Sequence, residues 1–156
     1  MLGGWREGLV RAWCDAIWRN AYDAALDGAG DLILPKRAAN ERHVFHQYTI
    51  CMPQRDALQQ FLNAQEIPTM VYYPVPLHVQ KPYLDSRHPQ GGLPISEMLC
   101  QEVLSLPMHT EMDNDQLTHI VKQLINFYKK YYNAKLDGEW INCSLERDQI
   151  KQLLGK

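Results

Sequence analysis

Apolar residues recur with helical spacing in five segments of the chain. The first segment, residues 5–26, predicts a long N-terminal helix that ends at the sequence GAG. Two shorter helices are predicted after prolines, at 54–65 and from Pro94 onward, because proline suits the first turn of a helix. The most regular stripe predicts a helix over 113–131, and an extra C-terminal helix is expected within 144–154. The stripe residues are, in chain order, Leu9, Trp13, Ile17 and Ala21; Ala57, Leu58, Phe61 and Leu62; Ile95, Met98, Leu99, Val103 and Leu106; Leu117, Ile120, Val121, Leu124, Phe127, Tyr128 and Tyr131; and Leu145, Ile150, Leu153 and Leu154.

The start of the longest predicted helix carries a local signal of its own. Asp113 and Gln116 have the spacing of a capping box, in which each side chain bonds to the backbone N–H of the other residue. Beyond about Asn133 the pattern changes, since DGEWIN predicts a turn and Ser144 can cap the last short helix.

Alternating side chains predict a strand in the sequence HVFHQYTICM, residues 43–52. One face of this strand carries Val44, Tyr48, Ile50 and Met52, and the other carries Phe45 and Thr49. Further extended segments are predicted for TMVYYPV at 69–75 and SLPMH at 105–109. Strands and helices that alternate at these lengths predict an α/β fold, more closely an α+β sandwich in which helices cover a small mixed or antiparallel sheet.

One extended stretch, PTMVYYPVPLHVQKPY at 68–83, is unusual because it combines three prolines with tyrosines and a histidine. Proline removes backbone donors and forbids a helix, so the stretch is predicted to leave the sheet as a stiff, exposed ribbon. Alternation predicts that Tyr73, Val75 and Leu77 point inward. The opposite face carries Tyr72, Pro74, Pro76 and His78. The alternative is an edge strand whose tyrosines cover the sheet.

Composition narrows the classes of protein. A chain of 156 residues with 46% hydrophobic residues suffices for one core and is expected to form one globular domain. The net charge of -2, with both signs scattered along the chain, favours neither nucleic acid nor an anionic membrane as a partner. Four cysteines without CxxC spacing, and an N-terminus interrupted by charges, predict a cytoplasmic protein with no signal peptide and no membrane span.

The histidines do not predict a metal site. His43 and His46 lie three residues apart on the predicted strand, so their side chains point to opposite faces and cannot chelate one ion. His109 is expected to be a turn residue rather than a base.

Several segments, in order along the chain, resemble the C-terminal small domain of the DegT/StrS family. They are RNAYDAAL (19–26), LILP (32–35), RHVFHQYTI (42–50), the stretches 55–83 and 93–109, and the helix at 114–128. Members of that family are pyridoxal-phosphate-dependent aminotransferases that act on keto sugars attached to nucleotides. The motifs YYPVPLHVQ and SLPMH are the most specific part of the resemblance. It implies a small domain over residues 1–133 and a tail outside the family, 134–156, that packs on it.

The resemblance also implies what this sequence lacks. In the family a large N-terminal domain supplies the Schiff-base lysine and most of the cofactor site. Lys36 and Lys81 are the only lysines before Lys122, and neither has the family's serine-to-lysine context. We therefore expect no catalytic residue in this chain and no binding of pyridoxal phosphate by this chain alone.

By resemblance, the ribbon Tyr72–Gln80 faces the cleft that holds the sugar. The residues expected to face the substrate are Tyr72, Tyr73, His78 and Gln80. The favoured hypothesis is an isolated small domain that is catalytically incomplete. One alternative is half of a split aminotransferase, completed by a separate domain that binds pyridoxal phosphate. The other is an interaction module that kept the fold and forms a homodimer. Weak binding of a nucleotide sugar that depends on Tyr72 would favour the split enzyme.

Overall fold

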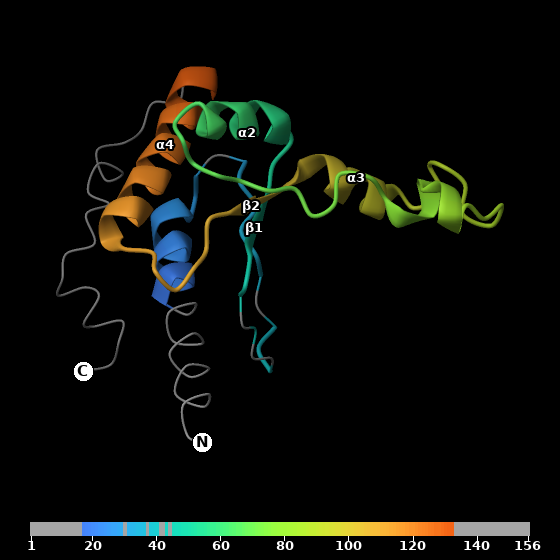
Figure 1. The fold of residues 1–156 in the computed structure, drawn as a ribbon, viewed down its shortest axis with the longest axis horizontal. Helices are drawn as coiled ribbons and strands as arrows, with labels where there is room; N and C mark the ends of the chain where they lie inside the picture. Colours follow the sequence, from blue (N-terminus) through green and yellow to red (C-terminus); the bar gives the residue numbers. More distant parts are fainter. Residues whose placement is uncertain (1–16, 30, 37, 41–42, 44, 133–156) are drawn as a thin grey trace.

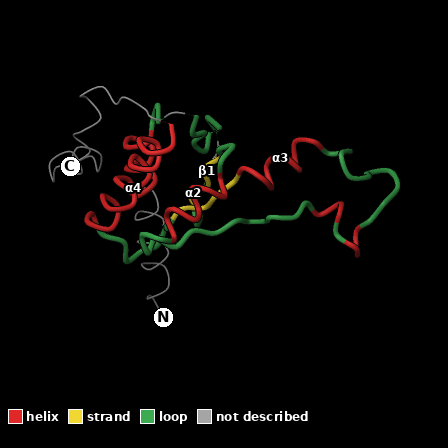
Figure 2. The backbone as a smooth tube through the Cα atoms, turned by 90° about the horizontal axis from the view of Figure 1, so that it is seen from above, coloured by secondary structure: helices red, strands yellow, loops and turns green. Residues whose placement is uncertain are grey.

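The computed structural model describes residues 17–29, 31–36, 38–40, 43 and 45–132. These residues form two parts of different character. A packed body carries the sheet and most of the helices, and a long arm, defined here as Val71–Glu102, projects away from it (Figure 1). The view from above shows the same projection, so the arm stands clear of the body in both directions (Figure 2).

The sheet of the body is small and antiparallel. Strand β1 (Tyr48–Cys51) pairs with β2 (Val103–Leu106) in a register that places Tyr48 opposite Leu106 and Cys51 opposite Val103. Single bridges extend the sheet on both sides, from Ile33 to Cys51 and from Met70 to Ser105. The predicted class, helices packed with a small antiparallel sheet, is confirmed.

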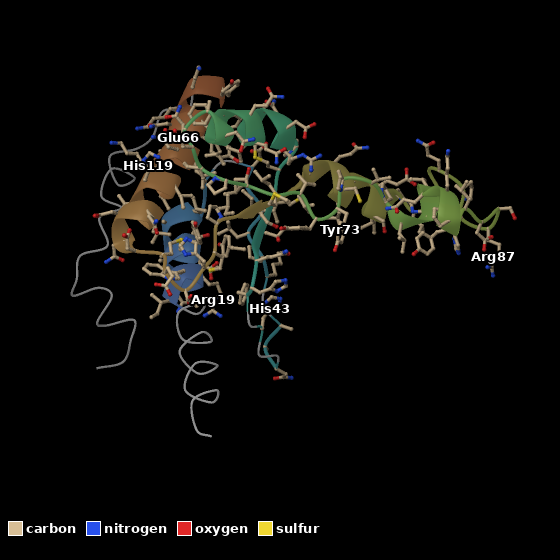
Figure 3. All side chains as sticks on the ribbon, in the orientation of Figure 1. Arg19, His43, Glu66, Tyr73, Arg87 and His119 are labelled. Carbon is tan, nitrogen blue, oxygen red and sulfur yellow. The ribbon has the colours of Figure 1, made fainter. Side chains whose placement is uncertain are left out.

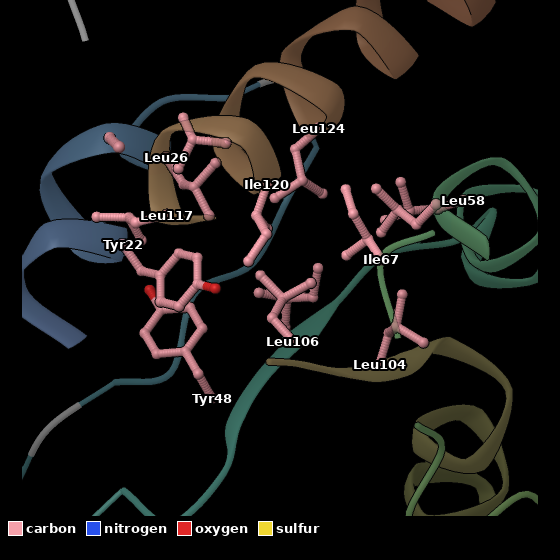
Figure 4. Packing of buried hydrophobic residues seen from close by; sticks show 14 of the residues in the cluster. Tyr22, Leu26, Tyr48, Leu58, Ile67, Leu104, Leu106, Leu117, Ile120 and Leu124 are labelled. Atoms are coloured by element: carbon pink, nitrogen blue, oxygen red, sulfur yellow. The ribbon is translucent and has the colours of Figure 1, made fainter. Parts of the chain in front are cut away.

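Three helical segments bury the apolar face of the two strands. They are residues 17–26, α2 (Arg55–Asn63) and α4 (Asn114–Tyr132). At one side of the core, the ring of Tyr22 stacks on that of Tyr48 with centroids 4.8 Å apart (Figure 4). The other large side chains that are fully buried are Leu26, Ile50, Met52, Leu58, Leu62, Leu104, Leu124 and Phe127. The predicted stripes of α2 and α4 therefore face this core. Of the first predicted stripe, Ala21 lies in the core, Ile17 is half-buried, and the members within residues 5–16 lie outside the described residues.

The predicted capping box is confirmed at the start of α4. The backbone N–H of Asp113 donates to Gln116 Oε1 at 3.1 Å, and the N–H of Gln116 donates to Asp113 Oδ1 at 2.8 Å. Each bond satisfies a backbone donor that the first helical turn leaves free. At the other end, Tyr131 is half exposed, and its ring stacks on Phe127 at 4.4 Å.

The strand predicted over 43–52 is shorter than its pattern indicated. Regular pairing covers only Tyr48–Cys51. Phe45, placed by alternation on the face opposite Tyr48, is instead buried in the same core. Its φ of 46° is the physical reason, because a left-handed residue turns the chain and breaks the two-residue repeat.

The helix predicted from Pro94 ends earlier than its apolar stripe indicates. Helix α3 (Pro94–Glu102) ends before Val103, and Val103 and Leu106 belong to strand β2. Pairing with β1 decides the outcome, because it places Leu106 opposite Tyr48 in the core. The tertiary contact therefore overrides the helical spacing of these two residues.

The arm itself has almost no interior. It runs outward through η1 (Leu77–Val79) and η2 (Lys81–Tyr83) and returns through α3. None of the residues of α3, all of which are described, is buried. The prediction that Tyr73, Val75 and Leu77 point inward is wrong, since all three are exposed, Tyr73 to 72%. The segment leaves the sheet after the Met70 bridge, so no layer remains for an inward face to cover.

Within the described part of the chain, no helix is both long and apolar enough to cross a membrane. The same residues contain no group of three or more side chains suited to binding a metal ion, and His43 accepts a hydrogen bond from the backbone of Phe45. The predicted tail at 134–156, with its final helix, lies outside the described residues.

Candidate functional site

The arm carries all four residues that the sequence predicts to face a substrate. Tyr73 lies on the inner part of the arm, and Arg87 lies near its outer end (Figure 3). The two tyrosine rings meet edge to face at 6.0 Å, and the peptide bond between these residues is cis. Both side chains are exposed, so their aromatic faces are open to a ligand.

His78 does not point freely into solvent. Its Nε2 lies 2.9 Å from Glu97 Oε1 on helix α3, and the histidine side chain is only 9% exposed. The contact joins the outgoing and returning segments of the arm. Sequence reasoning placed His78 on the ligand-facing side without any partner, and the structure gives it one.

Glu97 is a functional candidate that the sequence analysis missed. The same Oε1 that contacts His78 also accepts the backbone N–H of Gly91 at 2.7 Å. The hydrogen bond from His78 is the main cause that lowers the pKa of Glu97, and the backbone contacts of Gly91 and Leu93 act in the same direction. Gly91 has a φ of 83°, which favours glycine because a side chain is strained there.

Gln80 stabilises the arm internally. Its side-chain Nε2 donates to the carbonyl oxygen of Val75 at 3.0 Å. The prolines at 74 and 76 lie on the same ribbon and restrict its backbone. Of the four predicted residues, the structure therefore brings His78 and Gln80 into contacts within the arm and leaves Tyr72 and Tyr73 exposed.

The arm also presents an apolar surface that the body does not cover. Its exposed large apolar side chains are Tyr72, Tyr73, Val75, Leu77, Tyr83, Leu84, Leu93, Ile95, Met98 and Leu99. Such a concentration on one projecting segment is unusual for a surface that stays in water.

At the base of the arm, Cys51 and Glu102 form a polar pair of a different kind. The Cys51 thiol donates to Glu102 Oε2 at 3.3 Å. Burial, and then the hydrogen bond and charge of Glu102, raise the pKa of Cys51 to about 11. The thiol therefore stays protonated near neutral pH and is poorly suited to act as a nucleophile.

Every lysine side chain that the structure describes is exposed, namely those of Lys36, Lys81, Lys122, Lys129 and Lys130. A lysine that forms an imine needs a desolvated pocket or a neighbouring cation to lower its pKa. The described part of the chain provides no lysine in such a pocket.

The sequence matches a known family profile. The DegT/DnrJ/EryC1/StrS aminotransferase family matches residues 16–125. A pleiotropic regulatory protein of Geobacillus stearothermophilus is 44% identical over 106 residues, which are 67% of this chain and 28% of that protein. The UDP-N-acetyl-3-dehydro-alpha-D-glucosamine 3-aminotransferase of Acidithiobacillus ferrooxidans is 42% identical over 119 residues, 76% of this chain and 30% of that enzyme.

Solved structures give the same result. The crystal structure of DesV from S. venezuelae, in complex with a ketimine intermediate, superposes with a TM-score of 0.72 at 27% identity. The superposition covers 81% of this chain and 33% of DesV. A DegT DnrJ EryC1 StrS aminotransferase from Brucella abortus gives 0.66 at 32% identity, with 75% of this chain covering 31% of that one. The chain thus spans about a third of the length of these relatives.

Proposed function

Because the chain belongs to the DegT/DnrJ/EryC1/StrS aminotransferase family, we propose that it is the C-terminal small domain of an aminotransferase that acts on a keto sugar attached to a nucleotide. On its own it is catalytically incomplete. The observation that carries this proposal is the match itself, since it covers most of this chain and only about a third of each relative.

The cofactor of the family supports the second half of the proposal. Enzymes of this family use pyridoxal phosphate, which supplies the electron sink for amino transfer when it is bound. The residues that the structure describes do not fit this group, because all of their lysines are exposed. A domain that holds the cofactor must therefore act together with this one, within the same polypeptide or as a separate chain.

In that arrangement the arm forms one wall of the substrate site. Tyr72 and Tyr73 offer exposed aromatic faces and hydroxyl groups to a sugar or base. The restricted backbone at Pro74 and Pro76 keeps this wall at a low entropy cost. The polar contacts of His78 and Gln80 hold the ribbon in shape.

The exposed apolar side chains of the arm favour a second candidate function. A module that forms homodimers, or that docks on a separate domain binding pyridoxal phosphate, would bury them. Light scattering distinguishes these cases. A stable homodimer in which Tyr72 is protected from solvent supports the interaction module, and a monomer supports the isolated domain.

The incompleteness is tested with the cofactor directly. The full chain is incubated with pyridoxal phosphate, reduced with borohydride and analysed by peptide mass spectrometry. We expect no lysine to be modified stoichiometrically, because an exposed lysine forms only a weak and rapidly reversible imine. Stoichiometric labelling of a single lysine would overturn the proposal.

The substrate role is tested with UDP-N-acetylglucosamine as a probe in a calorimetric titration. We expect weak binding that Tyr72→Ala weakens by roughly tenfold, the size of one lost aromatic contact. Tyr83→Ala is the matched control, because Tyr83 is an exposed tyrosine on the outer part of the same arm. Equal effects of the two substitutions would contradict a specific role for Tyr72.

A further inference from the structure

Hydrogen bonds, rather than a core, define the shape of the arm. Helix α3 contributes no buried residue, so hydrophobic packing cannot fix its position against the outgoing ribbon. Few polar contacts connect the two segments, and the one made by Glu97 is central. Its carboxylate lies in the first turn of α3, where a negative charge also interacts favourably with the helix dipole.

A single oxygen of Glu97 accepts hydrogen bonds from two other segments of the arm. His78 Nε2 in η1 lies 2.9 Å from Oε1, and the N–H of Gly91 in the glycine turn lies 2.7 Å from it. Three segments of the arm, η1, the glycine turn and α3, therefore meet at one atom. Hydrogen bonds to a carboxylate are stronger than hydrogen bonds between neutral groups. The side chain of Glu97 is 20% exposed.

The contact determines which nitrogen of His78 carries a proton. An ionised carboxylate can only accept hydrogen bonds, so Nε2 must be the donor. In the neutral imidazole, Nδ1 is then an acceptor with a free lone pair. Nδ1 makes no hydrogen bond to any described residue, and the only described side-chain atoms that are buried without a partner are Trp18 Nε1 and Thr69 Oγ1. Nδ1 thus keeps a small part of its surface exposed, on a side chain that is 9% exposed as a whole.

We propose that Glu97 is a positioning residue of the arm, which holds the imidazole of His78 and the glycine turn so that Nδ1 is presented as a hydrogen-bond acceptor. A sugar hydroxyl is the matching donor. This assignment rests on the proposed function.

The proposal is tested by NMR on the full chain labelled with ¹⁵N in histidine and in the backbone. We expect the ring proton of His78 to be visible, bonded to Nε2 and protected from exchange. Glu97→Ala should remove this signal and speed the exchange of the Gly91 amide by roughly tenfold. Glu97→Gln keeps an oxygen acceptor at the same place. It should restore most of the ring-proton signal and most of the protection of the Gly91 amide.

Glu102→Ala is the matched control. It removes a carboxylate from the same helix, at the end that contacts Cys51, and should leave both signals unchanged. A ring proton on Nδ1 in the unmodified chain would overturn the proposal without the use of any variant. So would a Glu97→Ala variant that retains the protected proton on Nε2.

A ligand measurement separates this proposal from the function on which it rests. If the unmodified chain binds UDP-N-acetylglucosamine, Glu97→Ala should weaken that binding by roughly tenfold, and Glu97→Gln should restore it. If the probe does not bind while the protected Nε2 proton is present, the proposed substrate role of the arm fails. Positioning by Glu97 is still supported in that case, because its NMR signature needs no ligand.

Discussion

Helices α4 and α3 both carry apolar stripes, and the two stripes end in different surroundings. Most of the α4 stripe is buried in the core that α4 shares with α2, β1, β2 and the helix at 17–26, whereas the shorter stripe of α3, Ile95, Met98 and Leu99, stays exposed along the arm. An apolar stripe in the sequence therefore predicts that a helix face packs against another surface, but it does not predict which surface that is. In the body the partner is local to this chain. The apolar side chains of the arm stay exposed among the described residues, which agrees with the proposal that this domain works together with another one.

The largest expected effect comes from removing the same side chain in each part. Leu124→Ala in α4 deletes a fully buried leucine and should lower the free energy of unfolding by about 2–5 kcal/mol. Leu99→Ala in α3 deletes a half-exposed one and should cost less than about 1 kcal/mol. Urea denaturation monitored by circular dichroism measures both. Equal losses would mean that the arm is packed in solution against a surface that this chain supplies.

A smaller effect is expected at the junction between the two parts. Arg55 is nearly buried, and its Nη1 donates to the carbonyl oxygen of Val103 at 3.0 Å, directly after α3. Arg55→Ala leaves that carbonyl without its partner and should cost about 1–3 kcal/mol in the same denaturation experiment. Asp56→Ala is the control, because its exposed ion pair with Arg55 should contribute less than about 1 kcal/mol. If Asp56→Ala costs as much, the ion pair rather than the carbonyl contact holds the junction.

The smallest effect on global stability is the pH response of the arm. The pKa of Glu97 lies below its ordinary value of 4.5, chiefly through the hydrogen bond from His78 and further through the backbone of Gly91 and Leu93. The stabilising contact is therefore complete above pH 4.5 and is lost as the pH falls through the lowered pKa. The amide chemical shift of Gly91 should follow this transition. The amide of Ser105, bonded to Met70 in the sheet at 2.8 Å, should not move with it. If the chemical shift of the Gly91 amide changes with a midpoint at or above pH 4.5, the hydrogen bonds of Glu97 to His78 and Gly91 are contradicted.

Local signals in the sequence were sufficient for most of the body. The capping box at Asp113 and Gln116 is a contact between residues three positions apart, and the stripes of α2 and α4 depend only on helical repeat. The family resemblance and these patterns both predict a small sheet covered by helices, and the patterns leave open whether it is mixed or antiparallel. The predictions that were wrong depend on contacts between residues far apart in the sequence. Leu106, for example, has helical spacing but belongs to β2 because it pairs with Tyr48.

The candidate site shows the same division. The exposure of Tyr72 follows from the prolines beside it, which end the sheet pairing. The contact between His78 and Glu97 joins residues 19 positions apart, so no local repeat in the sequence predicts it. A glutamate in the first turn of a helix is common, and only the folded arm shows that this one accepts from two other segments.

The two cysteines that the structure describes offer a route to watch the arm alone. Cys51 sits at the base with its thiol bonded to Glu102, and its raised pKa leaves almost no thiolate for an electrophile to attack. Cys100 lies on α3 and is partly exposed. In a variant without Cys14 and Cys143, a maleimide dye should thus attach to Cys100 well before Cys51, and its fluorescence would report whether another surface docks on the arm.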